Sequence, residues 1–231
     1  MVVGLLVTLG VVGLIALGVV AFVQRGQGGL DLSLRGLLRV YLYLASLVGV
    51  IVFTLGIAGI LSFVLAAAFG RDLIYGGPPP QPVPLVAPGC PPNTTCPPQP
   101  SFAPREIPDE RERRQQEDLV RGITQLVFGG IFWGAHWAAR KGIVGGDERS
   151  SGLYRSYLIL GTAVFGIATI VLLPTGVYQA LSQALITAQP NSFRQGAGDA
   201  LAGGLATLPI WLLYLWLVQR ALRAPAAAPA A

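Results

Sequence analysis

The sequence predicts an all-α, multi-pass membrane protein with five transmembrane helices, and two observations favour this class. Hydrophobic residues make up 53% of the 231 residues and charged residues only 12%, whereas about a quarter of residues are charged in soluble globular domains. Several apolar runs also reach the roughly 20 residues needed to cross a bilayer core of about 30 Å. The net charge of +5 comes from basic residues spread over loops and helix ends, so it does not indicate nucleic-acid binding.

A repeated helix start organises the apolar runs into two hairpins. Four residue types recur 116 positions apart, in the pairs Arg39/Arg155, Tyr41/Tyr157, Leu42/Leu158 and Leu44/Leu160. Each copy is followed by an apolar segment with an aromatic end, and Trp137 aligns with Trp216 at an offset of 79. We therefore predict two parallel repeated hairpins behind one N-terminal helix, related by a pseudo-two-fold axis along the membrane normal.

The expected organisation of the chain has four parts. They are a transmembrane helix with a cytoplasmic link (1–36), a first hairpin with a long proline-rich outer loop at 71–118 (37–141), a second hairpin (142–220) and a disordered tail (221–231).

The first apolar run, from Val2 to Val23, is predicted to be a retained helix. It lacks the charged start and the small-residue cleavage site of a signal peptide. Its glycines, among them Gly10 and Gly13, would allow another helix to approach closely. The alternative is that membrane helices simply tolerate more glycine.

The second run, from about Val40 to Gly70, exceeds the bilayer core at 1.5 Å per residue, so it should tilt or project. The first part of the loop after it, from Gly76 through Pro104, is too dense in proline to hold a helix. It contains Cys90 and Cys96, the only two cysteines. We expect them to form a disulfide in an oxidising compartment, because a zinc site requires four ligands.

The remaining spans follow a charged segment at 109–118. Pairs at i,i+4, Asp109 with Arg113 and Glu110 with Arg114, favour an exposed helix there. It leads into spans expected at Leu119–Ala139, after Arg155 to about Ala188, and at Ala200–Val218. Pro174 should kink the fourth span near residues 170 to 174.

Basic residues predict the orientation of the chain. Nine of them lie in the short segments 24–39, 140–155 and 219–231, namely Arg25, Arg35, Arg39, Arg140, Lys141, Arg149, Arg155, Arg220 and Arg223. The short opposite loop offers only Arg194. The positive-inside rule therefore places the N-terminus outside and the C-terminus in the cytoplasm, in a multi-pass protein of the cell membrane.

His136 is the only histidine and the sharpest candidate for chemistry. Its imidazole could ligate haem or chlorophyll, but there is no second histidine for a bis-histidine haem. His136 also lies one turn from Arg140, near the membrane surface. A hydrogen bond to a neighbouring helix is the favoured alternative, so we expect no cofactor.

Other candidate residues lie at the expected cytoplasmic boundary. Trp133, Trp137 and Trp216 fit an aromatic belt at headgroup level better than a ligand-binding cage. Arg39 and Arg155 either contact lipid headgroups or a partner, or are snorkelling charges that set orientation. With Gly10 and Gly13, these residues are our predicted contacts with lipid or with other integral membrane proteins.

The five expected spans contain no Asp, Glu or Lys, and only Arg121 near one end. Transporters ordinarily need ionisable groups along the substrate path, so a small transporter or channel is a weaker alternative. The sequence also lacks a phosphate loop, paired carboxylates and a nucleophile–base arrangement, which argues against an enzyme. We expect an accessory or structural subunit of a larger membrane complex, respiratory or photosynthetic, with a pigment- or haem-binding subunit as the other alternative.

The repeated helix start and the segment Trp133-Gly-Ala-His136-Trp137-Ala-Ala-Arg140 carry a family resemblance. Over about residues 36 to 220 the chain resembles a family of uncharacterised bacterial integral membrane proteins, common in Chloroflexi-type thermophiles, with paired transmembrane helices. Leu215 stands where His136 would align in the second copy, so a role for this histidine is not repeated. The resemblance implies the paired helices and no particular activity.

Overall fold

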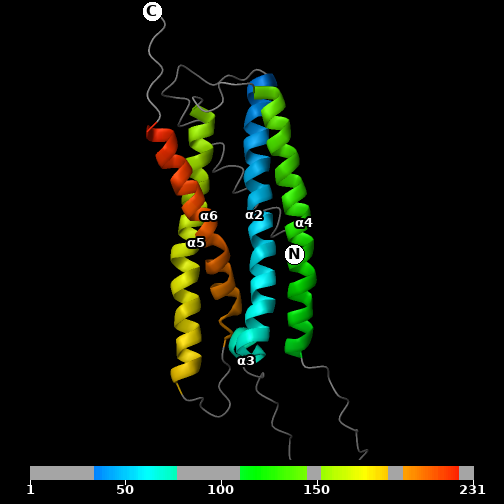
Figure 1. Cartoon of the computed structure of the whole chain (residues 1–231), viewed down its shortest axis with the longest axis vertical. Coiled ribbons are helices and arrows are strands. Elements are labelled where there is room, and N and C mark those ends of the chain that lie inside the picture. The colour runs from blue at the N-terminus through cyan, green and yellow to red at the C-terminus, as the bar shows by residue number, and fades with distance from the viewer. Residues whose placement is uncertain (1–33, 77–109, 145–151, 187–194, 224–231) are drawn as a thin grey trace, which may run out of the picture.

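The computed structural model describes residues 34–76, 110–144, 152–186 and 195–223, which form five helices (Figure 1). They are α2 (Leu34–Phe69), α3 (Arg71–Tyr75), α4 (Glu110–Val144), α5 (Gly152–Leu185) and α6 (Gly198–Arg223). Within these ranges the only β pairing is an isolated bridge between Gly76 and Gln195. The all-α class is confirmed. The expected span Val2–Val23 with Gly10 and Gly13, the cysteines Cys90 and Cys96, and the tail from residue 224 lie outside the described residues.

Three helices, α2, α5 and α6, are long and apolar enough to cross a membrane. The chain therefore has the helices of a membrane protein. α4 is only one residue shorter than α2, but it does not reach the same apolar character. Its first three turns are charged, and Gln125 and His136 lie within the part that was expected to span.

The helix boundaries differ from the expected spans in ways that local chemistry explains. α2 starts six residues before Val40, and at 36 residues it is about 54 Å long. It ends where Gly70 adopts a φ of 95°, a left-handed conformation that glycine tolerates best. The charged segment and the third expected span form one continuous helix, α4. The expected pair of Glu110 with Arg114 is confirmed, with a nitrogen–oxygen distance of 2.8 Å.

Both helices of the second hairpin contain a proline, Pro174 in α5 and Pro209 in α6. Pro174 was expected inside its span, whereas Pro209 was not singled out. Each removes one backbone hydrogen-bond donor from its helix.

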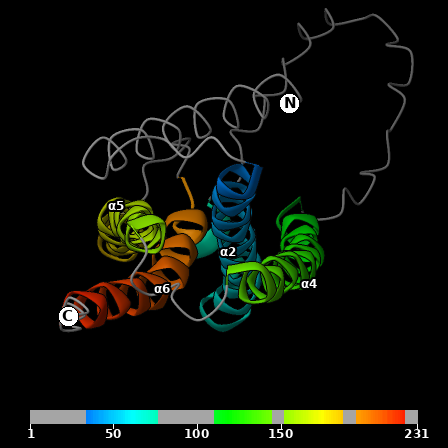
Figure 2. The ribbon, with the colours of Figure 1, turned by 90° about the horizontal axis from the view of Figure 1, so that it is seen from above.

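The helices form two antiparallel pairs, α2 with α4 and α5 with α6. α2 and α5 run in the same direction, as Figure 1 shows. Seen from above, the order across the molecule is α5, α6, α2, α4 (Figure 2), and the main contact between the two pairs is that of α2 with α6. A pseudo-two-fold axis would exchange α2 with α5 and α4 with α6. Equivalent helices would then face each other at the junction between the hairpins. The expected two-fold relation therefore does not describe this order, in which the hairpins stand side by side in the same sense.

Glycines let the helices of each pair approach closely. A Cβ atom built on Gly122 of α4 would lie 2.8 Å from the backbone nitrogen of Ile60 in α2, and one on Gly176 of α5 would lie 2.4 Å from that of Leu201 in α6. Both distances are too short for any other residue. Between the pairs, buried side chains form one apolar cluster, made of Leu47, Val50, Leu158, Phe165 and Tyr214.

Candidate functional site

Charged side chains divide the described bundle into two chemically different ends. The end formed by the starts of α2 and α5 and the ends of α4 and α6 holds basic residues and no carboxylate among the described residues: Arg35, Arg39, Arg140, Lys141, Arg155, Arg220 and Arg223. The opposite end holds every described carboxylate together with five arginines. We call these the basic end and the mixed end.

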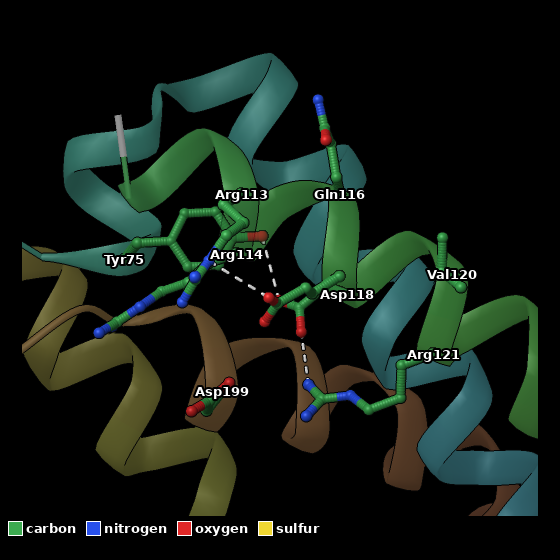
Figure 3. A pocket seen from close by; sticks show the side chains of 9 residues that line it. Tyr75, Arg113, Arg114, Gln116, Asp118, Val120, Arg121 and Asp199 are labelled. Carbon is green, nitrogen blue, oxygen red and sulfur yellow. Dashed lines mark hydrogen bonds and ion pairs between the residues drawn. The ribbon is translucent and has the colours of Figure 1, made fainter. Parts of the chain in front are cut away.

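A polar pocket of about 630 Å³ opens at the mixed end. Three helices position its walls: Tyr75 closes α3, Asp118 and Arg121 lie on α4, and Asp199 lies in the first turn of α6. Figure 3 shows these side chains together with Arg113, Arg114, Gln116 and Val120. Arginines and carboxylates are equally numerous on the lining, so the pocket carries little net charge.

Asp118 is the central group of this pocket. Its side chain is buried and accepts two hydrogen bonds, one from the Tyr75 hydroxyl to Oδ2 at 3.1 Å and one from the Arg121 guanidinium to Oδ1. Burial of a carboxylate is costly unless such partners are present. We call Tyr75, Asp118 and Arg121 the polar clasp, because they tie α3 to α4.

Further contacts extend the clasp to the start of α6. Arg71 donates from Nε to Oε1 of Gln115 at 2.7 Å, and Arg111 forms an ion pair with Asp72. The Ala197 amide donates to the Leu73 carbonyl oxygen at 3.0 Å. A short helix thus links the end of α2 to the starts of both α4 and α6.

Burial dominates the acid–base behaviour of the clasp. It raises the pKa of the Asp118 carboxyl, although the hydrogen bond from Tyr75 and the positive charge of Arg121 act in the opposite direction. Burial also raises the pKa of the Tyr75 hydroxyl, and the neighbouring Asp118 carboxylate adds to this increase. The hydroxyl therefore remains a hydrogen-bond donor at neutral pH.

The chemistry available to the pocket is limited by how its groups are used. Within the described ranges, no three His, Cys, Asp or Glu side chains are grouped closely enough to hold a metal ion. Arg113 and Arg114 are each paired with a glutamate on their own helix, Glu117 and Glu110. The arrangement fits a polar joint between helix ends better than it fits a reaction centre.

At the basic end, Arg140 of α4 is buried, with 7% of its surface exposed. Its Cζ atom lies 4.9 Å from the ring centroid of Tyr43 in α2 and 5.6 Å from that of Tyr157 in α5. The Tyr157 and Tyr214 hydroxyl oxygens are 2.6 Å apart. Cation–π contacts of this kind are worth about 2 kcal/mol when desolvated, so Arg140 helps to join the two hairpins.

His136 lies beside this cluster with both ring nitrogens in hydrogen-bond contact. Nδ1 is 2.7 Å from the Phe132 carbonyl oxygen, to which it donates, and Nε2 is 3.3 Å from the Tyr41 hydroxyl. The ring also lies 4.1 Å from that of Phe132, between centroids. An axial bond to haem or chlorophyll would require one of these hydrogen bonds to break.

The predicted tryptophans are exposed on the outer surface of the helices. Trp137 lies under the Lys141 ammonium, with 3.6 Å from Nζ to the ring centroid. Trp216 has Arg220 in the equivalent place, at 5.5 Å. Trp133 instead places its backbone against Gly49 of α2. Trp137 with Lys141 and Trp216 with Arg220 thus form matching pairs of an aromatic ring and a cation, one pair on each hairpin.

Arg39 and Arg155 both lie at the basic end. Arg155 is exposed and Arg39 partly exposed, and no described carboxylate lies within ion-pair distance of either. The structure thus brings the predicted arginines, tryptophans and His136 to one end of the bundle, but not into one pocket.

Sequence reasoning did not single out the polar clasp or the burial of Arg140. The spacing of Asp118 and Arg121, three residues apart on a helix, could have suggested an ion pair. Tyr75, however, is 43 residues from Asp118, and no periodicity connects two such residues.

Comparison with protein families gives one match. Residues 102–213, just under half of the chain, match a family described as Domain of unknown function (DUF5671). The matched range includes α4 and α5 and most of α6, and it crosses the expected boundary between the two hairpins. No curated protein and no solved structure is significantly similar to the chain. A match to a domain of unknown function agrees with the resemblance to an uncharacterised family and assigns no activity.

Proposed function

We propose that this chain is a structural subunit of a membrane protein complex and has no catalytic activity of its own. The observation that carries the proposal is the distribution of charge. Every charged side chain of the described helices lies at the basic end or the mixed end. Between the ends, the helices contact one another through glycines, threonines and apolar side chains. Such an interior suits close packing between helices and offers no ionisable group to a solute.

We further propose that five helices span the membrane, with α4 and the run Val2–Val23 joining α2, α5 and α6. α4 supports this assignment because it lies antiparallel to α2 along the bilayer direction, with the glycine contacts described above. Its carboxylates are confined to its first turns, and no arginine or lysine lies between Arg121 and Arg140. The remainder presents isoleucine, phenylalanine and tryptophan to the outside.

The proposed hairpins are parallel repeats placed in tandem. Gly59 of α2 meets Gly122 of α4. Offsets of 116 and 79 carry these positions to 175 and 201, and the contact found in the second hairpin is between Gly176 and Leu201. Agreement within one residue supports the repeat register.

The proposed orientation places the basic end in the cytoplasm. No described carboxylate lies at this end, and the positive-inside rule counts lysine and arginine in short cytoplasmic segments. The matching pairs Trp137/Lys141 and Trp216/Arg220 support an interface at that level, where an aromatic ring and a snorkelling cation both find a polar environment.

Co-purification from native membranes in mild detergent tests the proposed function. We expect at least one other integral membrane protein to accompany the tagged chain. Replacing Gly10→Leu together with Gly13→Leu should weaken this association and leave membrane insertion intact, because leucines in the first span would prevent close helix contact. The proposal fails if the chain is recovered without a partner, or if purified protein alone conducts a solute flux in liposomes.

A further inference from the structure

Two outer faces of the bundle repeat an interface that the molecule already contains. Inside the chain, α2 packs against α6 and thereby joins the hairpins. Ile51 of α2 and Ile210 of α6 both pack against the apolar cluster at this junction. The repeat offsets carry Ile51 to Ile167 of α5, and carry Ile210 back to Ile131 of α4. Isoleucine thus occupies both counterpart positions, on α5 and α4, which are the two outermost helices of the order α5, α6, α2, α4 (Figure 2).

The counterpart residues are exposed, whereas Ile51 and Ile210 are partly buried. Ile167 and Ile131 are 65% and 64% exposed. A neighbouring pair of counterpart positions shows the same difference in exposure. Thr54, which is buried in α2, corresponds to the exposed Ile170 in α5.

A row of residues along one face of α6, and its counterpart on α4, show the same difference in exposure. In α6, Ala202 and Ala206 are buried and lie one turn apart on the row that continues to Ile210. In α4 the corresponding row is Ile123, Val127 and Ile131, and all three side chains are exposed. The second hairpin thus buries the two alanines of this row and part of Ile210, whereas the first hairpin exposes all three of its apolar side chains.

We propose that copies of this chain associate head to tail in the membrane, with the α4 face around Ile131 of one copy packing against the α5 face around Ile167 of the next. This contact continues the internal interface between α6 and α2, because α4 corresponds to α6 and α5 corresponds to α2. The proposal rests on the repeat register, and it does not require the association with other membrane proteins proposed above.

The parallel sense of the hairpins limits the assembly that results. Because α2 and α5 run in the same direction, the step from one hairpin to the next keeps the same side of each copy facing the cytoplasm. Repeating the step therefore keeps every copy in the membrane plane. A head-to-tail contact of this kind closes into a ring when the rotation per step allows closure, and otherwise gives an open row.

Disulfide trapping in native membranes tests the contact. The full chain carries Cys90→Ser and Cys96→Ser, so that introduced cysteines are the only thiols. A chain with both Ile131→Cys and Ile167→Cys should give a ladder of dimers, trimers and larger species after oxidation with copper phenanthroline. Ile131→Cys on one tagged chain, coexpressed with Ile167→Cys on another, should give a dimer and nothing larger.

Two control pairs make either outcome decisive. Thr169→Cys with Thr207→Cys replaces two hydroxyl oxygens that are 2.9 Å apart in one chain, and should form an internal disulfide that consumes free thiol without a ladder. Leu55→Cys with Leu212→Cys uses two residues that are about half exposed and are not counterparts, and should give no ladder. The proposal is overturned if only the internal control reacts, if the Leu55/Leu212 pair gives the same ladder, or if either single isoleucine variant alone forms a dimer, which would indicate a symmetric contact.

Discussion

Asp118 shows how one buried carboxylate can set the pH response of the mixed end. Since burial raises its pKa, the folded protein holds the proton more tightly than the unfolded chain does. The resulting stabilisation is fully present below the unfolded pKa of about 4. It is lost as the pH rises through the higher folded pKa.

We therefore predict that the clasp opens more readily as the pH rises from about 4 toward neutrality. The readout is hydrogen-exchange protection of the Ala197 amide, corrected for the intrinsic exchange rate, because this amide bonds to the Leu73 carbonyl of α3. Asp118→Asn should flatten the pH dependence. Glu117→Gln alters an exposed neighbour and should leave it unchanged. An equally steep profile in Asp118→Asn would show that another group is responsible.

His136 provides a second prediction at this scale. We expect purified wild-type protein to show no absorption above the protein band, and His136→Ala to leave the spectrum unchanged, because both ring nitrogens are already in hydrogen-bond contact. Tyr41→Phe, which removes only the contact at Nε2, is the matched variant. A Soret or chlorin band that disappears in His136→Ala would instead establish the pigment- or haem-binding alternative.

At the scale of elements, the contact between α2 and α4 depends on a few glycines. A side chain at Gly122 would meet the backbone of α2, with its Cβ 2.8 Å from the Ile60 nitrogen, whereas one at Gly134 would meet nothing within 4 Å. Forcing extra volume into such a contact costs about 1–3 kcal/mol or more.

We predict that Gly122→Leu separates α2 from α4 and lowers the temperature at which the protein aggregates in detergent, measured by size-exclusion chromatography after heating. Gly134→Leu lies on the same helix and should behave like the wild type. Equal loss in both variants would mean that helix propensity or insertion, and not close packing, explains the effect.

The elements themselves were largely predictable, whereas their neighbours were not. Apolar length and the repeated start at Arg39 and Arg155 indicated α2 and α5 within a few residues, because these signals are local. The partner of α2 across the junction is set by side-chain shape and burial over distant segments, which the repeat does not encode. That is why tandem order replaced the expected two-fold relation. For the same reason the clasp partner of Asp118, Tyr75, was not foreseen.

At the scale of the whole molecule, the two ends differ in charge, and the proposed orientation is argued from this difference. The described cations of the basic end have no described carboxylate beside them, whereas the mixed end pairs arginines with carboxylates. Only the first arrangement carries a net positive charge that would resist translocation. The proposed topology follows from this difference.

We predict that residues 71–118 are outside and that the C-terminus is cytoplasmic. After reduction, a membrane-impermeant thiol reagent applied to intact cells should label Cys90 and Cys96. In a Cys90→Ser, Cys96→Ser background, Leu222→Cys places an exposed thiol near the basic end, and should be labelled only after the membrane is opened. The opposite topology would be indicated if Leu222→Cys were labelled in intact cells while Cys90 and Cys96 of the chain with its natural cysteines were not. It would also require the cations at the basic end of α2, α4, α5 and α6 to face outward against the positive-inside rule.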